Sequence, residues 1–378
     1  MKIGFMIYDN INAVSGGNLY DRKLLHVLQA HGAQVELINL RRLSYAGNLV
    51  DNGRWGLPGQ VAQADFDILL QDELLHPSLF LLNKEIRSRC GAIISIVHHL
   101  RSSESWVPWK KRLFRWVERR YLETVDGFIF NSLATKNSVM NLMPRTASGI
   151  VMYPGRDHIQ PHITQEEIRE RTQQSPPLRI LFLGNIIPRK GLHYLIEALS
   201  ELPGDLWKLA VVGNEAVDKV YAISIRSQLK LAGLEQNVVF HGTTNAAELE
   251  FIARASHLMA IPSAYEGFGI AYLEGMGYGL PAIASRAGGA GEFITQGQNG
   301  FLVDSADVNT LASIISGIGS DRTLLQKLSQ NAQETYETHP SWAEGGEQVY
   351  QFLSTFMNNA SQGQEINKQF VREGTSAN

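Results

Sequence analysis

Short apolar runs alternate along the chain with longer stretches in which apolar side chains recur at roughly helical spacing. Lys2–Tyr8 is the first such run and has the length of a strand, while Asn18–Ala30 has the leucine spacing of a helix. Strands that alternate with helices in this way predict parallel sheets. The further strands expected in the first half are Val35–Leu40, Ile68–Gln71, Ile93–Val97, Gly127–Asn131 and Ile150–Met152.

The alternation stops once and then starts again. Arg156–Pro177 is polar and charged, has no strong strand pattern and closes on Ser175, Pro176 and Pro177. Proline disfavours helix and suits a linker, so a domain boundary is expected near residues 160–177. The strands expected after it are Leu178–Leu183, Leu209–Val212, Val238–His241, Leu258–Ile261, Ala282–Ala284 and Phe301–Val303.

Two halves of this kind predict an α/β protein with two Rossmann-like domains, each a doubly wound parallel sheet, which face each other across a cleft. The N-terminal domain is expected over residues 1–165 and the C-terminal domain over residues 178–340. Residues 341–360 are expected to form a helix that packs back on the N-terminal domain. The polar residues 361–378 are expected to form a flexible tail.

The composition is that of a globular protein and argues against several classes of partner. The chain has 378 residues, of which 44% are hydrophobic and 19% charged, so it can bury two ordinary cores. A net charge of -3 gives no reason to expect a nucleic-acid partner. Cys90 is the single cysteine, which fits a reducing compartment. The apolar N-terminal run is too short for a signal peptide, and no stretch approaches the roughly 20 apolar residues of a membrane span, so a cytoplasmic protein is expected.

The segment from Ser263 to Pro281 is the strongest candidate for a ligand site. Gly267 and Gly269 follow an expected strand, permit a tight turn and let the backbone approach a ligand closely. A helix should begin near Ile270 and stop before the proline. The first amides of that helix lack intrahelical partners, and such a helix start suits a diphosphate.

Two glutamates flank this turn. Glu266 precedes the glycines, where its carboxylate could accept hydrogen bonds from the hydroxyls of a sugar. Glu274 would lie about one turn into the helix, where it can accept two hydroxyls, as on a ribose. The alternative is a corner whose carboxylate only offsets the helix dipole. Two glutamates eight positions apart around Gly-Phe-Gly are less easily explained that way.

A second candidate lies where the strand Leu178–Leu183 ends at Gly184. Lys190 falls between this strand and a helix expected to start near Gly191. A lysine beside free helix amides can balance the charge of a diphosphate leaving group. Arg189 is either a second phosphate ligand or a solvated surface charge.

The N-terminal half has two weaker candidates. Ser15, Gly16 and Gly17 form a loop between the first strand and the first helix, but they do not match the dinucleotide-binding pattern Gly-x-Gly-x-x-Gly. His98 and His99 stand at the end of a strand, where open α/β sheets bind ligands. A lone histidine is more often structural than catalytic.

The segment with Glu266 and Glu274 resembles the Glu-x7-Glu signature of glycosyltransferase family 4, retaining enzymes of the GT-B fold within the glycosyl transferases group 1. The resemblance implies that the first glutamate contacts the donor sugar and the second the nucleotide ribose. The same resemblance assigns backbone contacts with the sugar and the diphosphate to Gly267, Phe268, Gly269 and Ile270. The pattern continues through Gly279, Leu280, Pro281, Gly288, Gly289, Glu292 and the run Asn299–Val303. Gly275 and Gly277 depart from it, since the family more often has alanine there.

The resemblance also gives roles to the weaker candidates. It places Lys190 on the donor phosphates, but Asn185 stands where the family usually has an arginine. Arg189 is therefore the candidate for the missing cation. The loop Gly16–Gly17 would approach the diphosphate and the sugar, and His98 would face the reacting sugar or the acceptor.

These expectations describe a retaining glycosyltransferase that moves a hexose from a UDP- or GDP-sugar to an acceptor hydroxyl, in polysaccharide or glycolipid biosynthesis. Its catalytic residues would be His98, Glu266 and Lys190, and no cofactor or metal is expected, since no clear Asp-x-Asp motif is present. One alternative is a non-catalytic sugar-nucleotide-binding or assembly protein, which Asn185 favours. Another is a nucleotide-dependent oxidoreductase, which predicts a glycine pattern that the first loop lacks.

The stretch Trp109–Arg120 is basic and aromatic. As a helix it would place Trp109, Leu113, Trp116 and Val117 on one face and several cations on another, and such a helix can lie on an anionic membrane. The alternative is an ordinary domain helix with its aromatic face in the core. The expected partners are thus a nucleotide sugar, an unidentified acceptor and, on the first interpretation, a membrane surface.

Overall fold

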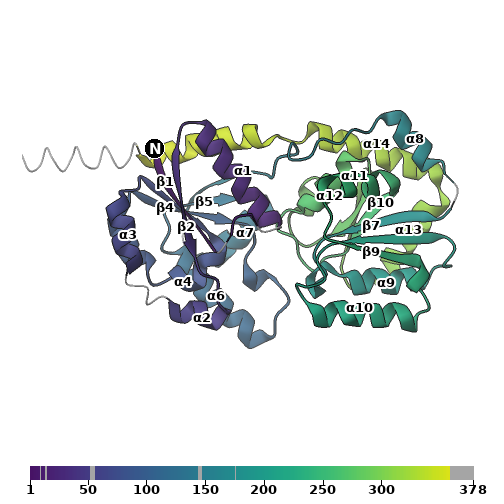
Figure 1. The fold of residues 1–378 in the computed structure, drawn as a ribbon, viewed down its shortest axis with the longest axis horizontal. Helices are drawn as coiled ribbons and strands as arrows, with labels where there is room; N and C mark the ends of the chain where they lie inside the picture. Colours follow the sequence, from purple (N-terminus) through teal and green to yellow (C-terminus); the bar gives the residue numbers. More distant parts are fainter. Residues whose placement is uncertain (9, 13–14, 52–55, 144–146, 175, 358–378) are drawn as a thin grey trace, which may run out of the picture. The chain divides into compact units, whose positions relative to one another are not determined.

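The computed structural model describes residues 1–8, 10–12, 15–51, 56–143, 147–174 and 176–357. The described chain divides into two compact units (Figure 1). The N-terminal unit contains Met1–Pro154 together with the described residues from Ser341 onward, and the C-terminal unit contains Gly155–Pro340. The predicted tail over residues 361–378 lies outside the described residues.

The N-terminal unit is built on a six-stranded parallel sheet in the order β2-β1-β3-β4-β5-β6. Because β1 lies between β2 and β3, the strand order reverses there, as in a doubly wound sheet. The strands are β1 (Lys2–Tyr8), β2 (Gln34–Leu40), β3 (Ile68–Asp72), β4 (Ala92–Val97), β5 (Gly127–Phe130) and β6 (Ser148–Val151).

Helices cover both faces of this sheet (Figure 1). The helices are α1 (Gly16–Ala30), α2 (Tyr45–Val50), α3 (Gly56–Ala64), α4 (His76–Leu79), α5 (Asn83–Ile86), α6 (Pro108–Leu122) and α7 (Leu133–Leu142). Short 3-10 turns are η2 (Glu73–Leu75), η3 (Arg87–Arg89) and η4 (Arg101–Ser103). Successive strand residues point to opposite faces, so Phe5 belongs to the core beneath α1, and Met6 to the core beneath α6 and α7.

The end of the described chain completes the first of these cores. Residues 342–357 are helical, and Trp342, Val349 and Leu353 are buried in the same core as Leu24 of α1. The Trp342 ring meets Tyr20 edge-on, with 5.5 Å between the ring centroids. One face of the N-terminal sheet is therefore covered jointly by α1 and by a segment that follows the whole C-terminal unit.

The C-terminal unit repeats the architecture with a second six-stranded parallel sheet, in the order β12-β11-β10-β7-β8-β9. Its strands are β7 (Leu178–Leu183), β8 (Trp207–Val212), β9 (Val238–Gly242), β10 (Leu258–Ile261), β11 (Ala282–Ser285) and β12 (Gly300–Val303). Its helices are α8 (Gln165–Thr172), α9 (Leu192–Ser200), α10 (Lys219–Leu231), α11 (Ala246–Ala255), α12 (Ile270–Gly277), α13 (Val308–Ser320) and α14 (Arg322–Thr338). Its 3-10 turns are η5 (Pro188–Lys190), η6 (Glu235–Asn237) and η7 (Gly289–Glu292).

The stretch expected to be a linker contains α8. Thr164 and Glu167 form a capping box at the start of this helix, and Ile168 and Arg171 are buried. The helix packs against α14 of the C-terminal unit. The polar composition of residues 156–177 therefore reflects a capped surface helix with one buried face, and these residues belong to the C-terminal unit.

The predicted α/β class with two doubly wound parallel sheets is confirmed. Every strand expected from the apolar runs is present, with ends that differ by two residues or fewer. Among the described residues, no helix combines the length and the apolar character needed to cross a bilayer.

Candidate functional site

The turn after β10 holds the backbone of Glu266 in place. The Glu266 amide donates to Ala287 O at 3.1 Å, and the Gly289 amide donates to Glu266 O at 3.0 Å. Gly288 has a φ of +106°, and a Cβ at this position would collide with Glu266 O. Gly269, with a φ of +102°, caps the N-terminus of α12, which begins at Ile270 as predicted. Glycine is required at both positions because other residues rarely adopt this conformation.

The Glu266 side chain is buried among cationic and hydroxyl groups. Its Oε1 accepts from Lys190 Nζ at 2.6 Å and from Ser263 Oγ at 2.6 Å, and Arg189 Nη1 lies 3.7 Å away. Burial alone raises the pKa of a carboxyl group, but the charges of Lys190 and Arg189 and the two hydrogen bonds outweigh it and lower the pKa of Glu266 to about 2. Glu266 is therefore ionised at neutral pH and acts as a hydrogen-bond acceptor.

A second loop brings the two cations to Glu266. Gly191 has a φ of +72°, and a Cβ there would collide with Pro262 O, so this glycine lets the loop after β7 lie against the end of β10. Arg189 Nη1 donates to Tyr265 O at 2.7 Å, and the Ala264 amide donates to Arg189 O at 2.7 Å. Lys190, Arg189 and Glu266, which the sequence analysis selected separately, thus form one cluster.

Glu274 is paired with a histidine that the sequence analysis did not select. His158 Nε2 lies 2.8 Å from Glu274 Oε1, and His158 Nδ1 lies 3.0 Å from Gly155 O. Both ring nitrogens lie within hydrogen-bond distance of an oxygen atom, which orients the ring toward the carboxylate of Glu274. The contact fixes one carboxylate oxygen of Glu274 on α12.

Three further predicted residues of the C-terminal site are Phe268, Asn185 and Gly267. The Phe268 ring is buried and stacks on Phe293 with 4.7 Å between centroids, so only its backbone is available to a ligand. Asn185 follows Gly184 at the carboxyl end of β7, and the Lys190 side chain passes close to that glycine, 3.3 Å from the place of a Cβ. Gly267 lies between the buried carboxylate of Glu266 and the start of α12.

In the N-terminal unit, His98 lies at the carboxyl end of β4 and is buried. Its Nε2 is 3.0 Å from Asp21 Oδ1 on α1, and its ring meets Tyr20 edge-on. Burial lowers the pKa of a histidine, but the charges of Asp21, Asp72 and Glu73 and the hydrogen bond to Asp21 raise the pKa of His98 to about 9. His98 is therefore a hydrogen-bond donor at neutral pH, not a base.

The predicted glycine loop does meet this histidine. Gly17 lies against the His98 ring, since a Cβ at position 17 would be 3.4 Å from its Cδ2. Gly16 is the first residue of α1, and Ser15 caps the helix by accepting from the Asn18 amide at 3.1 Å. Loop and histidine thus belong to one corner of the N-terminal unit.

A second buried cluster lies beside the first. Glu73 and Glu118 are buried, and burial raises the pKa of each carboxyl group to about 7. Glu73 Oε2 and Glu118 Oε2 lack a hydrogen-bond partner among the described residues, whereas Glu73 Oε1 lies 3.1 Å from His76 Nδ1. His76 lies next to them, with Nδ1 2.9 Å from Glu73 O and Nε2 3.2 Å from the Tyr45 hydroxyl.

These clusters contain the two groups of described side chains whose arrangement could hold a metal ion. The first is Asp21, Asp72 and His98, and the second is Glu73, His76 and Glu118, with ligand atoms within 4.8 Å of one another. His98 Nε2 already faces Asp21, and both nitrogens of His76 already have partners. A cation in either group would therefore compete with hydrogen bonds that the histidine already makes within the protein.

Comparison with known families places the C-terminal site in context. Residues 164–335 match the family described as "Glycosyl transferases group 1". Relatives include the D-inositol 3-phosphate glycosyltransferase of Corynebacterium glutamicum, 25% identical over 66% of this chain and 61% of the relative. Another is the GDP-mannose-dependent alpha-(1-6)-phosphatidylinositol monomannoside mannosyltransferase of Mycolicibacterium smegmatis, 31% identical over 41% of this chain and 42% of the relative. The chain spans about half the length of the curated relatives that it matches.

Solved structures match over nearly the whole chain. The sucrose-phosphate synthase of Thermosynechococcus elongatus superposes with a TM-score of 0.81 at 18% identity, covering 95% of this chain and 99% of that structure. HepE of Anabaena, solved with UDP and glucose, gives a TM-score of 0.72 at 22% identity, covering 94% of this chain and 100% of that structure. Together with the two sheets, these matches confirm the predicted GT-B fold.

Proposed function

Residues 164–335 belong to the glycosyl transferases group 1, and on this premise we propose that the protein transfers a hexose from a nucleoside diphosphate sugar to an acceptor hydroxyl. The observation that carries the proposal is the cluster of Lys190, Arg189 and Glu266 beside the start of α12. It joins two cations, a buried acceptor and free helix amides within the region that matches the family.

The chemistry follows from the charges of this cluster. When the donor bond breaks, negative charge develops on the diphosphate. Lys190, Arg189 and the first amides of α12 stabilise that charge. Arg189 supplies the second cation, in place of the arginine that Asn185 replaces. No cofactor or metal takes part in the proposed reaction.

The two glutamates hold the donor at different points. Glu266 is ionised and accepts hydrogen bonds from the sugar hydroxyls, sharing its charge with Lys190. Glu274 accepts from the ribose hydroxyls. Transfer keeps the anomeric configuration, and the departing phosphate takes the proton of the acceptor hydroxyl. His98, as an imidazolium, donates to the sugar or the acceptor. UDP- and GDP-sugars are the donors to test, since one relative is named for GDP-mannose and one solved structure contains UDP.

The test is a thermal-shift screen with UDP, GDP, ADP and their common sugar conjugates, followed by measurement of nucleoside diphosphate release. One nucleotide should raise the melting temperature, because a ligand that binds only the folded state stabilises it. Glu274→Ala should remove the shift, whereas Glu235→Ala, an exposed control in the same unit, should keep it. The anomeric configuration of the product, measured by NMR, tests retention.

Two results would contradict the proposal. No shift with any nucleotide would exclude the donor site. A shift without release of nucleoside diphosphate, across a panel of acceptor hydroxyls, would favour a sugar-nucleotide-binding protein that does not catalyse transfer.

The proposal extends to peripheral membrane contact through Trp109–Arg120. Support comes from the exposure of this stretch, since the side chains of Trp109 and Trp116 are 65% and 52% exposed. A basic helix with outward tryptophans suits the surface of an anionic bilayer.

A further inference from the structure

Helix α6 buries one face and leaves its tryptophans outside. Phe114, Val117 and Tyr121 point into the N-terminal unit and are buried. Trp109 and Trp116 lie on the opposite face, together with Leu113, which is 37% exposed. The expectation that Val117 shares a face with the tryptophans is wrong. The alternative of a domain helix with aromatic side chains in the core holds for Phe114 and Tyr121 but not for the two tryptophans. Apolar side chains that are exposed together on one face of a helix are typical of an interaction surface.

The same outward face is strongly basic. Its exposed cations are Lys111, Arg112, Arg115, Arg119 and Arg120. Within the described chain, only Arg119 among them has a carboxylate at ion-pair distance, 2.9 Å from Glu123 Oε1. The whole chain has a net charge of -3, so this is a local concentration of positive charge on an otherwise slightly acidic protein.

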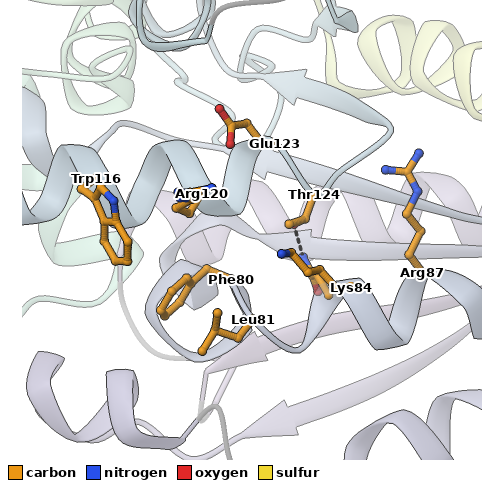
Figure 2. A pocket seen from close by; sticks show the side chains of 9 residues that line it. Phe80, Leu81, Lys84, Arg87, Trp116, Arg120, Glu123 and Thr124 are labelled. Atoms are coloured by element: carbon orange, nitrogen blue, oxygen red, sulfur yellow. Dashed lines mark hydrogen bonds between the residues drawn. The ribbon is translucent and has the colours of Figure 1, made fainter.

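A groove of about 560 Å³ runs beside this helix. Helix α6 forms one wall, and the segment from the end of α4 through α5 forms the other (Figure 2). The lining side chains are Phe80, Leu81, Asn83, Lys84, Arg87, Trp116, Arg120, Glu123 and Thr124. The groove belongs to the N-terminal unit alone.

The groove has an apolar end and a cationic part. Figure 2 shows Trp116, Phe80 and Leu81 toward one end and Arg87 at the other. The rings of Phe80 and Trp116 meet edge-on, with 5.9 Å between centroids, and Leu81 is 55% exposed. Lys84 lies between the two ends, on the side of Thr124.

Two of the groove cations are available to an anion. Within the described residues, neither Lys84 nor Arg120 has a carboxylate at ion-pair distance. Arg120 lies over the Trp116 ring, 5.8 Å from its centroid. Arg87 is paired with Asp126, and Glu123 with Arg119. A negative group in the groove would thus meet two unpaired cations next to exposed apolar side chains.

We propose that this groove binds the phosphate headgroup of an anionic membrane lipid, with Lys84 and Arg120 on the phosphate. Trp116 and Leu81 contact the apolar part of the lipid, and Trp109 and Leu113 enter the bilayer interface. A lipid is favoured over a free phosphate because the groove opens beside the exposed tryptophans, which a water-soluble anion would leave in water.

The inference deepens the membrane contact proposed above and rests on it. It does not depend on the donor site, because the groove residues lie in the N-terminal unit and the nucleotide cluster lies in the C-terminal unit. The two proposals can therefore fail separately.

The experiment is co-sedimentation of the full chain with phosphatidylcholine vesicles, with and without phosphatidylglycerol. Wild type should bind only the vesicles that contain the anionic lipid. The double variant Lys84→Glu/Arg120→Glu should bind them at least about tenfold more weakly, since each cation near an anionic surface contributes about 1 kcal/mol. The matched control Lys219→Glu/Lys230→Glu makes the same change of charge on exposed lysines of α10 and should bind like wild type.

Further measurements separate the groove from the general charge of the helix. The double variant Arg112→Glu/Arg115→Glu changes the net charge by the same amount, at positions of α6 that lie outside the groove. It should weaken vesicle binding less than the groove variant does. All variants should keep the wild-type melting temperature and circular-dichroism spectrum, which would show that they are folded.

The proposal is overturned if the groove variant binds vesicles like wild type, or if it loses no more affinity than Arg112→Glu/Arg115→Glu. Binding to neither type of vesicle would overturn it as well. The proposal is also overturned if glycerol phosphate raises the melting temperature of wild type but not of the groove variant, while wild type binds no vesicles. That result would identify a free phosphate as the ligand.

Discussion

At the scale of single residues, the ion pair between Lys190 and Glu266 governs the candidate donor site. Both side chains are mostly buried, so each charge depends on the other for compensation. The pair also fixes the position of the one cation that every part of the donor proposal needs. Its geometry comes from Gly191, which lets the lysine loop lie against the end of β10.

We predict that Lys190→Met lowers the free energy of unfolding by about 3 kcal/mol, because it leaves the Glu266 charge buried without its closest partner. The double variant Lys190→Met/Glu266→Gln should recover most of that loss, since no isolated charge remains. Transfer activity should stay low in both variants. Chemical denaturation and nucleoside diphosphate release measure the two effects, and equal stability of the single and double variants would contradict the argument.

The buried carboxyl group of Glu118 makes stability depend on pH. Burial raises its pKa from 4.5 to about 7, so the folded state keeps this proton to a higher pH than the unfolded state. The stabilising contribution is therefore complete below pH 4.5 and is lost as the pH rises through about 7.

We predict that Glu118→Gln melts like wild type at about pH 5 and at a higher temperature than wild type at about pH 8, because the neutral amide loses no proton. The free-energy difference between the two conditions should not exceed about 3 kcal/mol. Glu123→Gln, on a partly exposed residue just beyond the same helix, is the control and should show no such gain. A pH-independent difference between wild type and Glu118→Gln would show that the carboxyl group does not hold its proton.

At the scale of elements, the two glycines of α12 that depart from the family pattern are explained by close packing. A Cβ at Gly277 would lie 2.7 Å from Pro161 Cγ and 3.0 Å from the Tyr336 ring. A Cβ at Gly275 would lie 2.6 Å from Met259 Cε, the end of a flexible side chain that can move. The helix gives up intrinsic stability so that neighbouring elements can approach it.

Alanine at these positions should therefore act against helix propensity. We predict that Gly277→Ala lowers the melting temperature, although alanine stabilises an unpacked helix by up to about 1 kcal/mol. Gly317→Ala on α13 is the matched control, because nothing lies within 4 Å of the added methyl group, and it should raise the melting temperature. A gain of stability in both variants would contradict the packing argument.

The apolar runs were sufficient to predict the strands, because a parallel strand with both faces covered is continuously apolar. Helix α8 was missed because its sequence is polar apart from Ile168.

The candidate site could be predicted only in part. Glycine turns and helix starts are local features of the sequence, so Glu266 and Lys190 could be predicted. His158 could not, since it meets Glu274 from 116 residues away and no local pattern marks it. The Asp21–His98 pair was missed for the same reason, with 77 residues between its members.

At the scale of the whole molecule, four of the residues discussed for the donor site come from one unit. Lys190, Glu266, Glu274 and His158 lie within Gly155–Pro340. This unit has its own sheet and its own helices on both faces. It should therefore keep its structure and its nucleotide affinity without the rest of the chain.

We predict that a fragment of residues 155–340 melts cooperatively and binds the same nucleotide as the full chain within about threefold, but transfers no sugar. Calorimetric titration of fragment and full chain measures the affinity, and Glu274→Ala in the fragment is the control. A folded fragment without nucleotide affinity would show that the N-terminal unit supplies contacts essential for the donor.

The chain enters the C-terminal unit after Pro154 and leaves it at Ser341, and the returning helix completes the core beneath α1. This path sets the order of events on the ribosome. The unit made first cannot finish folding until the last helix has been synthesised, whereas the unit made second can fold earlier. During the intervening synthesis, the apolar sheet face around Ile3, Phe5 and Ile7 has no complete cover. The nascent N-terminal unit should therefore need protection by chaperones. Premature termination just before residues 342–357 would release a chain whose C-terminal unit is folded and whose N-terminal unit is not.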